Sequence, residues 1–181
     1  MIYFSSDFHF NHKNIISYCN RPFKSLEEMD KTIIDNINST VKEEDTLYFL
    51  GDFGFTKSSE APEARKDTFE YYRNQIKCKN IIYIKGNHDK NNRNKTILES
   101  AIISYGGERI FLTHNPEYCN VHFKLNFCGH VHEKWLFKRY RKGESFTDCC
   151  NVGVDVNNFY PVTINQILSN YYKWKKENNH V

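Results

Sequence analysis

The chain has 181 residues, with 25 basic and 22 acidic side chains and a formal net charge of +3. A domain usually takes about 100 to 200 residues, so this length can bury a sizeable core and argues against disordered and fibrous classes. No apolar run approaches the roughly 18 residues of a membrane helix, and residues 1–7 lack the basic region that opens a signal peptide. We expect a single domain over residues 1–181, in the cytoplasm and without a membrane partner.

Six cysteines are scattered through the chain without a C-x-x-C pair. A chain that buries its own core does not need disulfides to hold it together. We therefore expect reduced thiols that pack as small apolar side chains, and no thiolate metal site. The six are Cys19, Cys78, Cys119, Cys128, Cys149 and Cys150.

Strands and helices alternate in the first half of the chain. Apolar, β-branched and aromatic runs predict buried strands at residues 1–5, 46–50 and 80–85. Ser25 to Glu28 has the pattern of a capping box, which predicts a helix from there to about Thr40. Pro62 is placed in the first turn of a second helix that runs to about residue 76. This alternation is typical of a layered α/β sheet.

The second half of the chain has a different pattern. A further strand is predicted at residues 109–113, and residues 125–128, 135–141 and 146–150 are interpreted as antiparallel or edge strands. The last two are joined by a hairpin turn at residues 141–144. A terminal helix follows at residues 163–176.

Carboxylate, imidazole and amide side chains follow five of the predicted strands. The spacing of Asp7 with His9, and of His130 with His132, would send each pair to one face of an extended backbone. Glycines beside several of these residues allow sharp turns and close approach of the backbone. Each motif alone is an ordinary turn, but five of them in sequence, each after a strand, predict one shared site. Its residues are Asp7, His9, Asp52, Asn87, His88, Asp89, His114, His130 and His132.

This set of motifs resembles the calcineurin-like metallophosphoesterase superfamily, in its order and over nearly the whole chain. Residues 8–16, 19–23 and 151–156 resemble a small bacterial and phage branch of predicted phosphoesterases. The resemblance implies an α/β fold, a four-layer αββα sandwich with mixed sheets. The motifs are Asp7-Phe8-His9, Gly51-Asp52, Gly86-Asn87-His88-Asp89, His114 and Gly129-His130-Val131-His132.

The resemblance also implies two divalent metal ions. Nitrogen and oxygen donors without sulfur suit Mn²⁺, which we expect, or Fe or Zn²⁺. Asp52 would bridge the ions, since a carboxylate offers two oxygens to ions about 3.5 to 4 Å apart. By the same resemblance, one ion would be held by Asp7, His9 and His132, and the other by Asn87, His114 and His130.

The mechanism that the resemblance implies is in-line attack on phosphorus by a metal-bound hydroxide. His88 would be the general acid, and Asp89 would orient and charge its ring. Arg21 and His12 are the next candidates: Arg21 would contact a phosphate oxygen and His12 would lie at the edge of the site. Alternatively, Arg21 is a solvated loop cation and His12 caps a helix. Asp155 is expected to turn a loop or to support a ligand.

We expect a metal-dependent phosphoester hydrolase, either a phosphodiesterase or a nucleotidase. A non-catalytic scaffold of the same fold is the alternative, but His88 and every metal ligand are present. The stretch Gly51 to Phe55 has no arginine, which disfavours protein Ser/Thr phosphatases and diadenosine tetraphosphatases. A nuclease remains open, although the mild charge gives it no support. The substrate is thus a phosphate ester of a small molecule, a nucleotide or a nucleic-acid end, and the oligomeric state is left open.

Overall fold

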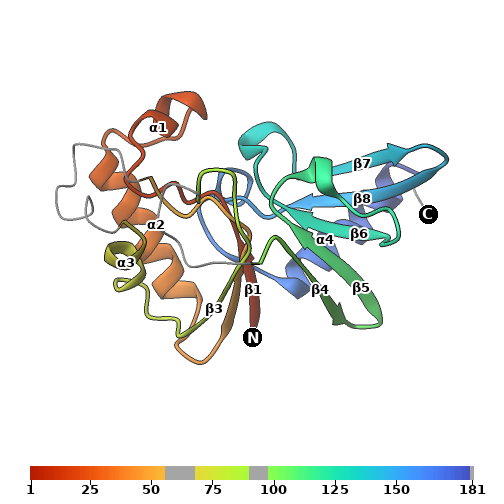
Figure 1. Ribbon diagram of the computed structural model, residues 1–181, viewed down its shortest axis with the longest axis horizontal. Coiled ribbons are helices and arrows are strands. Elements are labelled where there is room, and N and C mark those ends of the chain that lie inside the picture. Colours follow the sequence, from red (N-terminus) through yellow and green to blue (C-terminus); the bar gives the residue numbers. More distant parts are fainter. Residues whose placement is uncertain (56–67, 90–97, 180–181) are drawn as a thin grey trace.

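The computed structural model describes residues 1–55, 68–89 and 98–179. Two β-sheets lie side by side, and three helices cover the outer face of the first sheet (Figure 1). In this first sheet the order is β3-β2-β1-β9; β1, β2 and β3 are parallel, and β9 is antiparallel to β1. Its strands and helices are β1 (Ile2–Ser5), α1 (Asn14–Tyr18), α2 (Leu26–Thr40), β2 (Thr46–Phe49), α3 (Thr68–Arg73), β3 (Asn80–Tyr83) and β9 (Val162–Thr163).

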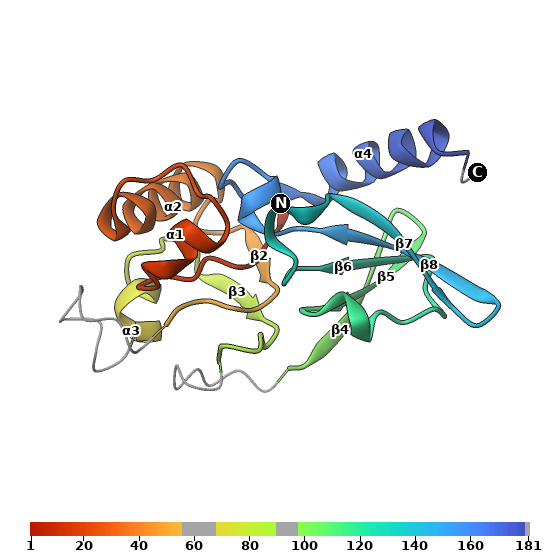
Figure 2. The same cartoon turned by 90° about the horizontal axis from the view of Figure 1, so that it is seen from above.

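The second sheet has the order β4-β5-β6-β8-β7. Its central strands β5, β6 and β8 are parallel, whereas β4 and β7 are antiparallel edge strands. Helix α4 runs alongside this sheet (Figure 2). The described residues form two mixed sheets and four α-helices, which confirms the predicted fold class. The elements are β4 (Ser100–Tyr105), β5 (Glu108–Thr113), β6 (Leu125–Cys128), β7 (Phe137–Lys142), β8 (Ser145–Asn151) and α4 (Ile164–Glu177).

Successive side chains on the strands of the first sheet point to opposite faces, so the sheet contributes to two hydrophobic cores. On β1, Tyr3 packs toward α2, whereas Phe4 packs between the two sheets. Met29, Ile33 and Ile37 of α2 are fully buried, because a spacing of four residues places them on one helix face. Burial of each such side chain contributes about 1.5 to 3 kcal/mol. The strands that lead into the polar loops are thereby packed between two clusters of buried side chains.

The start of α2 follows the predicted N-cap. Ser25 is the N-cap of α2, and its hydroxyl accepts a hydrogen bond from the backbone N–H of Glu28 at 3.1 Å. The Glu28 carboxylate accepts instead from the backbone N–H of Lys24, one residue before the cap. The start predicted at Pro62 lies outside the described residues. In the described residues, no helix is long and apolar enough to cross a membrane.

One expectation needs correction, and one strand was missed. The segment 125–128 was interpreted as an antiparallel or edge strand, but β6 is central and parallel to both neighbours. Its polar residue Asn126 is fully buried and donates to Thr147 Oγ1 at 2.6 Å, a pairing that spacing along the chain does not reveal. Strand β4 was not predicted. Cys119 and Cys149 lie side by side, but their Cα atoms are 7.4 Å apart, farther than a disulfide ordinarily spans, so the expectation of reduced thiols stays a prediction for these two.

Candidate metal centre

The loops that follow β1, β2, β3, β5 and β6 bring their polar side chains together. Five of these residues have left-handed backbone conformations, which cost a non-glycine residue about 1 to 2 kcal/mol. The prediction that alternation on extended backbone aims these side chains is therefore wrong, because sharp turns aim them. The φ values are +60° at Asp7, +53° at His9, +61° at Asp52, +71° at His130 and +48° at His132.

Glycine is required where these loops touch. A Cβ atom at Gly86 would lie 2.1 Å from Asp52 Oδ1. A Cβ atom at Gly129 would lie 2.3 Å from Ser6 Oγ and 2.5 Å from Asp7 Oδ2. Real Cβ atoms do not make contacts this short, so the predicted close approach of backbone at these glycines is confirmed.

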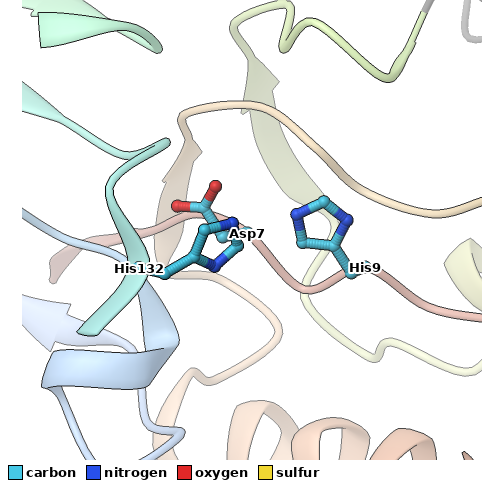
Figure 3. A group of neighbouring side chains, drawn as sticks. All are labelled: Asp7, His9 and His132. Carbon is cyan, nitrogen blue, oxygen red and sulfur yellow. The ribbon is translucent and has the colours of Figure 1, made fainter. Parts of the chain in front are cut away.

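A first cluster consists of Asp7, His9 and His132, whose ligand atoms lie within 4.8 Å of one another. Figure 3 shows Asp7 and His9 on the segment after β1 and His132 on the segment that faces it. The Asp7 carboxylate accepts from the Ser6 hydroxyl at 2.6 Å and from the backbone N–H of His130 at 3.0 Å. His9 Nε2 is buried and has no hydrogen-bond partner within the described residues. A buried nitrogen without a partner fits a metal ligand, because leaving it unpaired is otherwise costly.

A second cluster consists of Asn87, His114 and His130. Asn87 Oδ1 lies 3.0 Å from His114 Nε2 and 2.9 Å from His130 Nδ1. His114 Nδ1 donates to the carbonyl oxygen of Leu50 at 2.7 Å, since a carbonyl can only accept. This hydrogen bond fixes the ring so that Nε2 faces the centre, as in histidines that bind metals.

Asp52 lies between the two clusters. Its Oδ2 is 3.5 Å from His9 Nε2 and 3.4 Å from His114 Nε2, while Oδ1 accepts from the backbone N–H of His88 at 2.9 Å. Burial raises the pKa of Asp52, but the hydrogen bond and charge of His114, with His9, hold it well below its usual value. Burial lowers the pKa of His114, but Asp52 overrides this and raises it to about 9. The site therefore attracts positive charge, which a divalent cation would supply in place of the proton.

A buried chain of ion pairs orients His132. Its Nδ1 donates to Asp155 Oδ2 at 2.9 Å. Arg21 binds the same carboxylate with two N–H groups, at 2.8 and 2.9 Å. Burial lowers the pKa of His132, but its hydrogen bond to Asp155, with other partners, raises it to about 10. The expectation that Asp155 supports a ligand is confirmed in this sense, because it positions the His132 ring.

The predicted contact of Arg21 with substrate phosphate is contradicted. The side chain is fully buried, and its remaining N–H groups donate to the carbonyl oxygens of Asp7 at 2.7 Å and of Phe8 at 3.0 Å. All its donors thus point into the protein. The alternative of a solvated loop cation is equally wrong, because Arg21 braces the loop that carries the first cluster.

Asp89 was predicted to orient His88, and the structure contradicts this as well. Both carboxylate oxygens accept from backbone N–H groups, those of Gly86 at 2.7 Å and of Asp52 and Phe53 at 3.0 Å. Burial raises the pKa of Asp89 despite these hydrogen bonds. Asp89 therefore ties the loop after β3 to the loop after β2.

His88 and His12 lie beside the first cluster. The ring of His88 is 5.4 Å from that of His9, and the ring of His12 lies 6.3 Å from that of His88. His12 stacks on Phe55 at 4.6 Å, and its Nδ1 is 3.4 Å from His9 Nδ1. His12 is thus at the edge of the site, as expected, and its contact with phosphate stays a prediction.

Two residues that the sequence reasoning missed hold the ligands. Ser6 binds Asp7, and Asn151 donates to the carbonyl oxygen of His132 at 2.8 Å and to that of Trp135 at 3.0 Å. Neither has a sequence signal, since a serine before an aspartate and an asparagine at the end of a strand are both common.

Comparison with known proteins identifies the domain that carries these clusters. Residues 1–153 match the model of the calcineurin-like phosphoesterase superfamily domain. The chain belongs to this superfamily. Proteins of the calcineurin-like phosphoesterase superfamily typically depend on divalent metals, and both clusters offer suitable ligands.

Two relatives match nearly the whole chain. An uncharacterized protein of Methanocaldococcus jannaschii is 38% identical over 179 residues, which cover 96% of this chain and 93% of that one. A solved structure of a protein of unknown function from Aquifex aeolicus is 26% identical, with a TM-score of 0.67. It covers 93% of this chain and 98% of that one. The similarity to these two proteins therefore extends beyond residues 1–153 into the C-terminal residues.

Proposed function

We propose that this phosphoesterase domain is a dinuclear metal-dependent hydrolase of phosphate esters, with phosphodiesters or nucleotides as substrates. The position of Asp52 carries the proposal. One of its oxygens is 3.5 Å from a nitrogen of the first cluster and 3.4 Å from a nitrogen of the second. A carboxylate in this position would bridge two ions, and the low pKa of Asp52 keeps it anionic.

The donor set fits two divalent cations, and we expect Mn²⁺. The first cluster supplies a carboxylate and two imidazoles, and the second supplies an amide and two imidazoles. Cations at these positions would supply Lewis-acid charge for displacement at phosphorus. The neutral amide of Asn87 keeps the second position less anionic, which favours the approach of a phosphate group.

His88 is the side chain that we assign to proton transfer. Asp52 Oδ1 accepts from its backbone N–H, so the loop that carries His88 is fixed to the residue between the clusters. Its ring is only half-buried and lies 5.4 Å from the ring of His9. From there the imidazole can donate a proton to the departing oxygen of the ester.

Hydrolysis of two aryl esters tests this function. Chelator-treated protein is resupplied with Mn²⁺ and assayed with bis(p-nitrophenyl) phosphate and with p-nitrophenyl phosphate. We expect metal-dependent turnover with preference for the diester, and its loss in His88→Ala. The exposed His122 provides the matched control, and His122→Ala should keep the rate. Absence of turnover in protein that holds two metal equivalents would contradict the proposal and favour a non-catalytic scaffold.

A further inference from the structure

A cavity of about 370 Å³ opens beside the second cluster. Asn87 and His114 form one wall, and the surrounding residues include Lys85, Glu99 and Tyr118. This volume lies within the range of about 300 to 1,000 Å³ that is typical of small-molecule sites. A group esterified to a phosphate held by the second cluster would therefore extend into this cavity.

Tyr118 is a largely exposed aromatic residue at the cavity. Tyr118 is 72% exposed and ends the short helix Pro116–Tyr118. Lys142 Nζ donates to the carbonyl oxygens of Glu117 at 3.0 Å and of Cys119 at 2.9 Å. These hydrogen bonds tether the backbone on both sides of Tyr118, which lines the cavity. An exposed aromatic ring on a tethered backbone suits stacking against a planar group such as a nucleobase.

Glu99 supplies an acceptor in the same cavity. Its side chain is 84% exposed, and its contact with Lys85 is long, at 3.9 Å. An exposed ion pair of this kind contributes little, so the carboxylate can exchange it for other donors. Paired hydroxyl groups of a ribose are donors of the required type, and acidic side chains bind them in dinucleotide sites.

We propose that this cavity binds the nucleoside part of the substrate, with the base on Tyr118 and the ribose hydroxyls at Glu99. The phosphate then lies at the second cluster, so the substrate class is a ribonucleotide ester. This inference rests on the proposed function, and it narrows that function from phosphate esters in general to nucleotides.

The test compares two esters with the same leaving group. Adenosine 5′-(p-nitrophenyl) phosphate carries the nucleoside, and methyl p-nitrophenyl phosphate does not. Stacking on one aromatic ring contributes about 1 to 3 kcal/mol, so we expect kcat/KM to favour the nucleoside ester by about tenfold or more. Tyr118→Leu should bring that ratio close to one, and Tyr118→Phe should retain it. Phe146→Leu, which removes an exposed ring on β8, should keep both rates.

The Glu99 contact is tested with the 2′-deoxyadenosine ester. The unmodified protein should prefer the ribose form, and Glu99→Gln should reduce that preference. A ratio near one for adenosine over methyl ester in the unmodified protein, or a ratio that survives Tyr118→Leu, would overturn the inference.

A binding measurement separates this inference from the proposed hydrolysis. Calorimetric titration of the Mn²⁺-loaded protein with AMP and with inorganic phosphate needs no turnover. We expect AMP to bind at least about tenfold more tightly than phosphate, with that advantage lost in Tyr118→Leu. Should neither ester be hydrolysed, the hydrolase proposal fails, and equal affinities for AMP and phosphate would then overturn the nucleoside pocket independently.

Discussion

The two clusters use similar ligands in different surroundings. Asp7 and His9 of the first cluster are 0% and 1% exposed, and the Arg21–Asp155 ion pair braces its third member, His132. The second cluster is open at the exposed Asn87 and lines a cavity. The first arrangement is suited to holding a cation permanently, and the second leaves space for a substrate. Burial and the partners behind the ligands, rather than the ligand types, create this difference.

The broadest effect, on metal content at both positions and on turnover, is expected at the residue that both clusters share. Asp52→Asn should reduce metal content at both positions and lower turnover of bis(p-nitrophenyl) phosphate by roughly 10²- to 10³-fold or more, because charge stabilisation is lost. Elemental analysis and the rate assay measure the two effects. Two full metal equivalents in the variant would contradict a bridging role.

Removal of the proposed acid should separate chemistry from metal binding. His88→Ala should lower kcat by about 10²- to 10⁴-fold while both metal equivalents remain. The loss should be larger for an alkyl ester than for a p-nitrophenyl ester, since a poor leaving group depends more on protonation. Equal losses for the two esters would indicate that His88 does not donate the proton.

Loss of the hydrogen bond between His132 and Asp155 should affect the first cluster alone. Asp155→Asn weakens the orientation of His132 and should reduce metal affinity at this cluster by about 10- to 100-fold. Metal titration should then show one weakened and one unchanged equivalent. Asn87→Ala provides the matched change at the second cluster, and equal weakening of both positions by Asp155→Asn would contradict separate clusters.

The smallest effect is expected at Asp30, a buried carboxylate outside both clusters. Its pKa is raised, whereas that of Asp52 is lowered. Burial raises the pKa of Asp30 from 3.8 to about 7, although Tyr72 and the backbone of Asn11 donate to it. The folded state thus binds the proton more tightly, so stability is present below pH 3.8 and is lost as pH rises through about 7.

Asp30→Asn should remove this part of the pH dependence. Between these two pKa values the free energy of unfolding should fall less steeply in the variant, by at most about 1.4 kcal/mol per pH unit. Urea titrations of both proteins in chelator from pH 4 to pH 8 measure the difference. Parallel curves over this range would show that Asp30 keeps an ordinary pKa.

Local patterns predicted most elements of the fold, but not how they are placed. The N-cap at Ser25 and the strand at 46–50 were predicted because each depends on residues that are close together in the sequence. The structure has α2 and β2 at these positions. The central position of β6 depends on pairing with β5 and β8, whose registers are set by distant contacts. Strand β4 was missed because its burial pattern alternates only weakly, with exposed and half-buried residues.

The sequence by itself determined the family and the residues that could bind metals, because turns rich in glycine, carboxylates and imidazoles follow its buried strands. Only the tertiary structure decided the roles of Arg21 and Asp89. The partner of Arg21, Asp155, is 134 residues away, and Asp89 binds backbone N–H groups 36 and 37 residues away. A long or buried polar side chain takes the partners that folding brings to it, and chain spacing does not encode them. The cavity at Tyr118 was likewise decided by folding, because its walls come from separate loops.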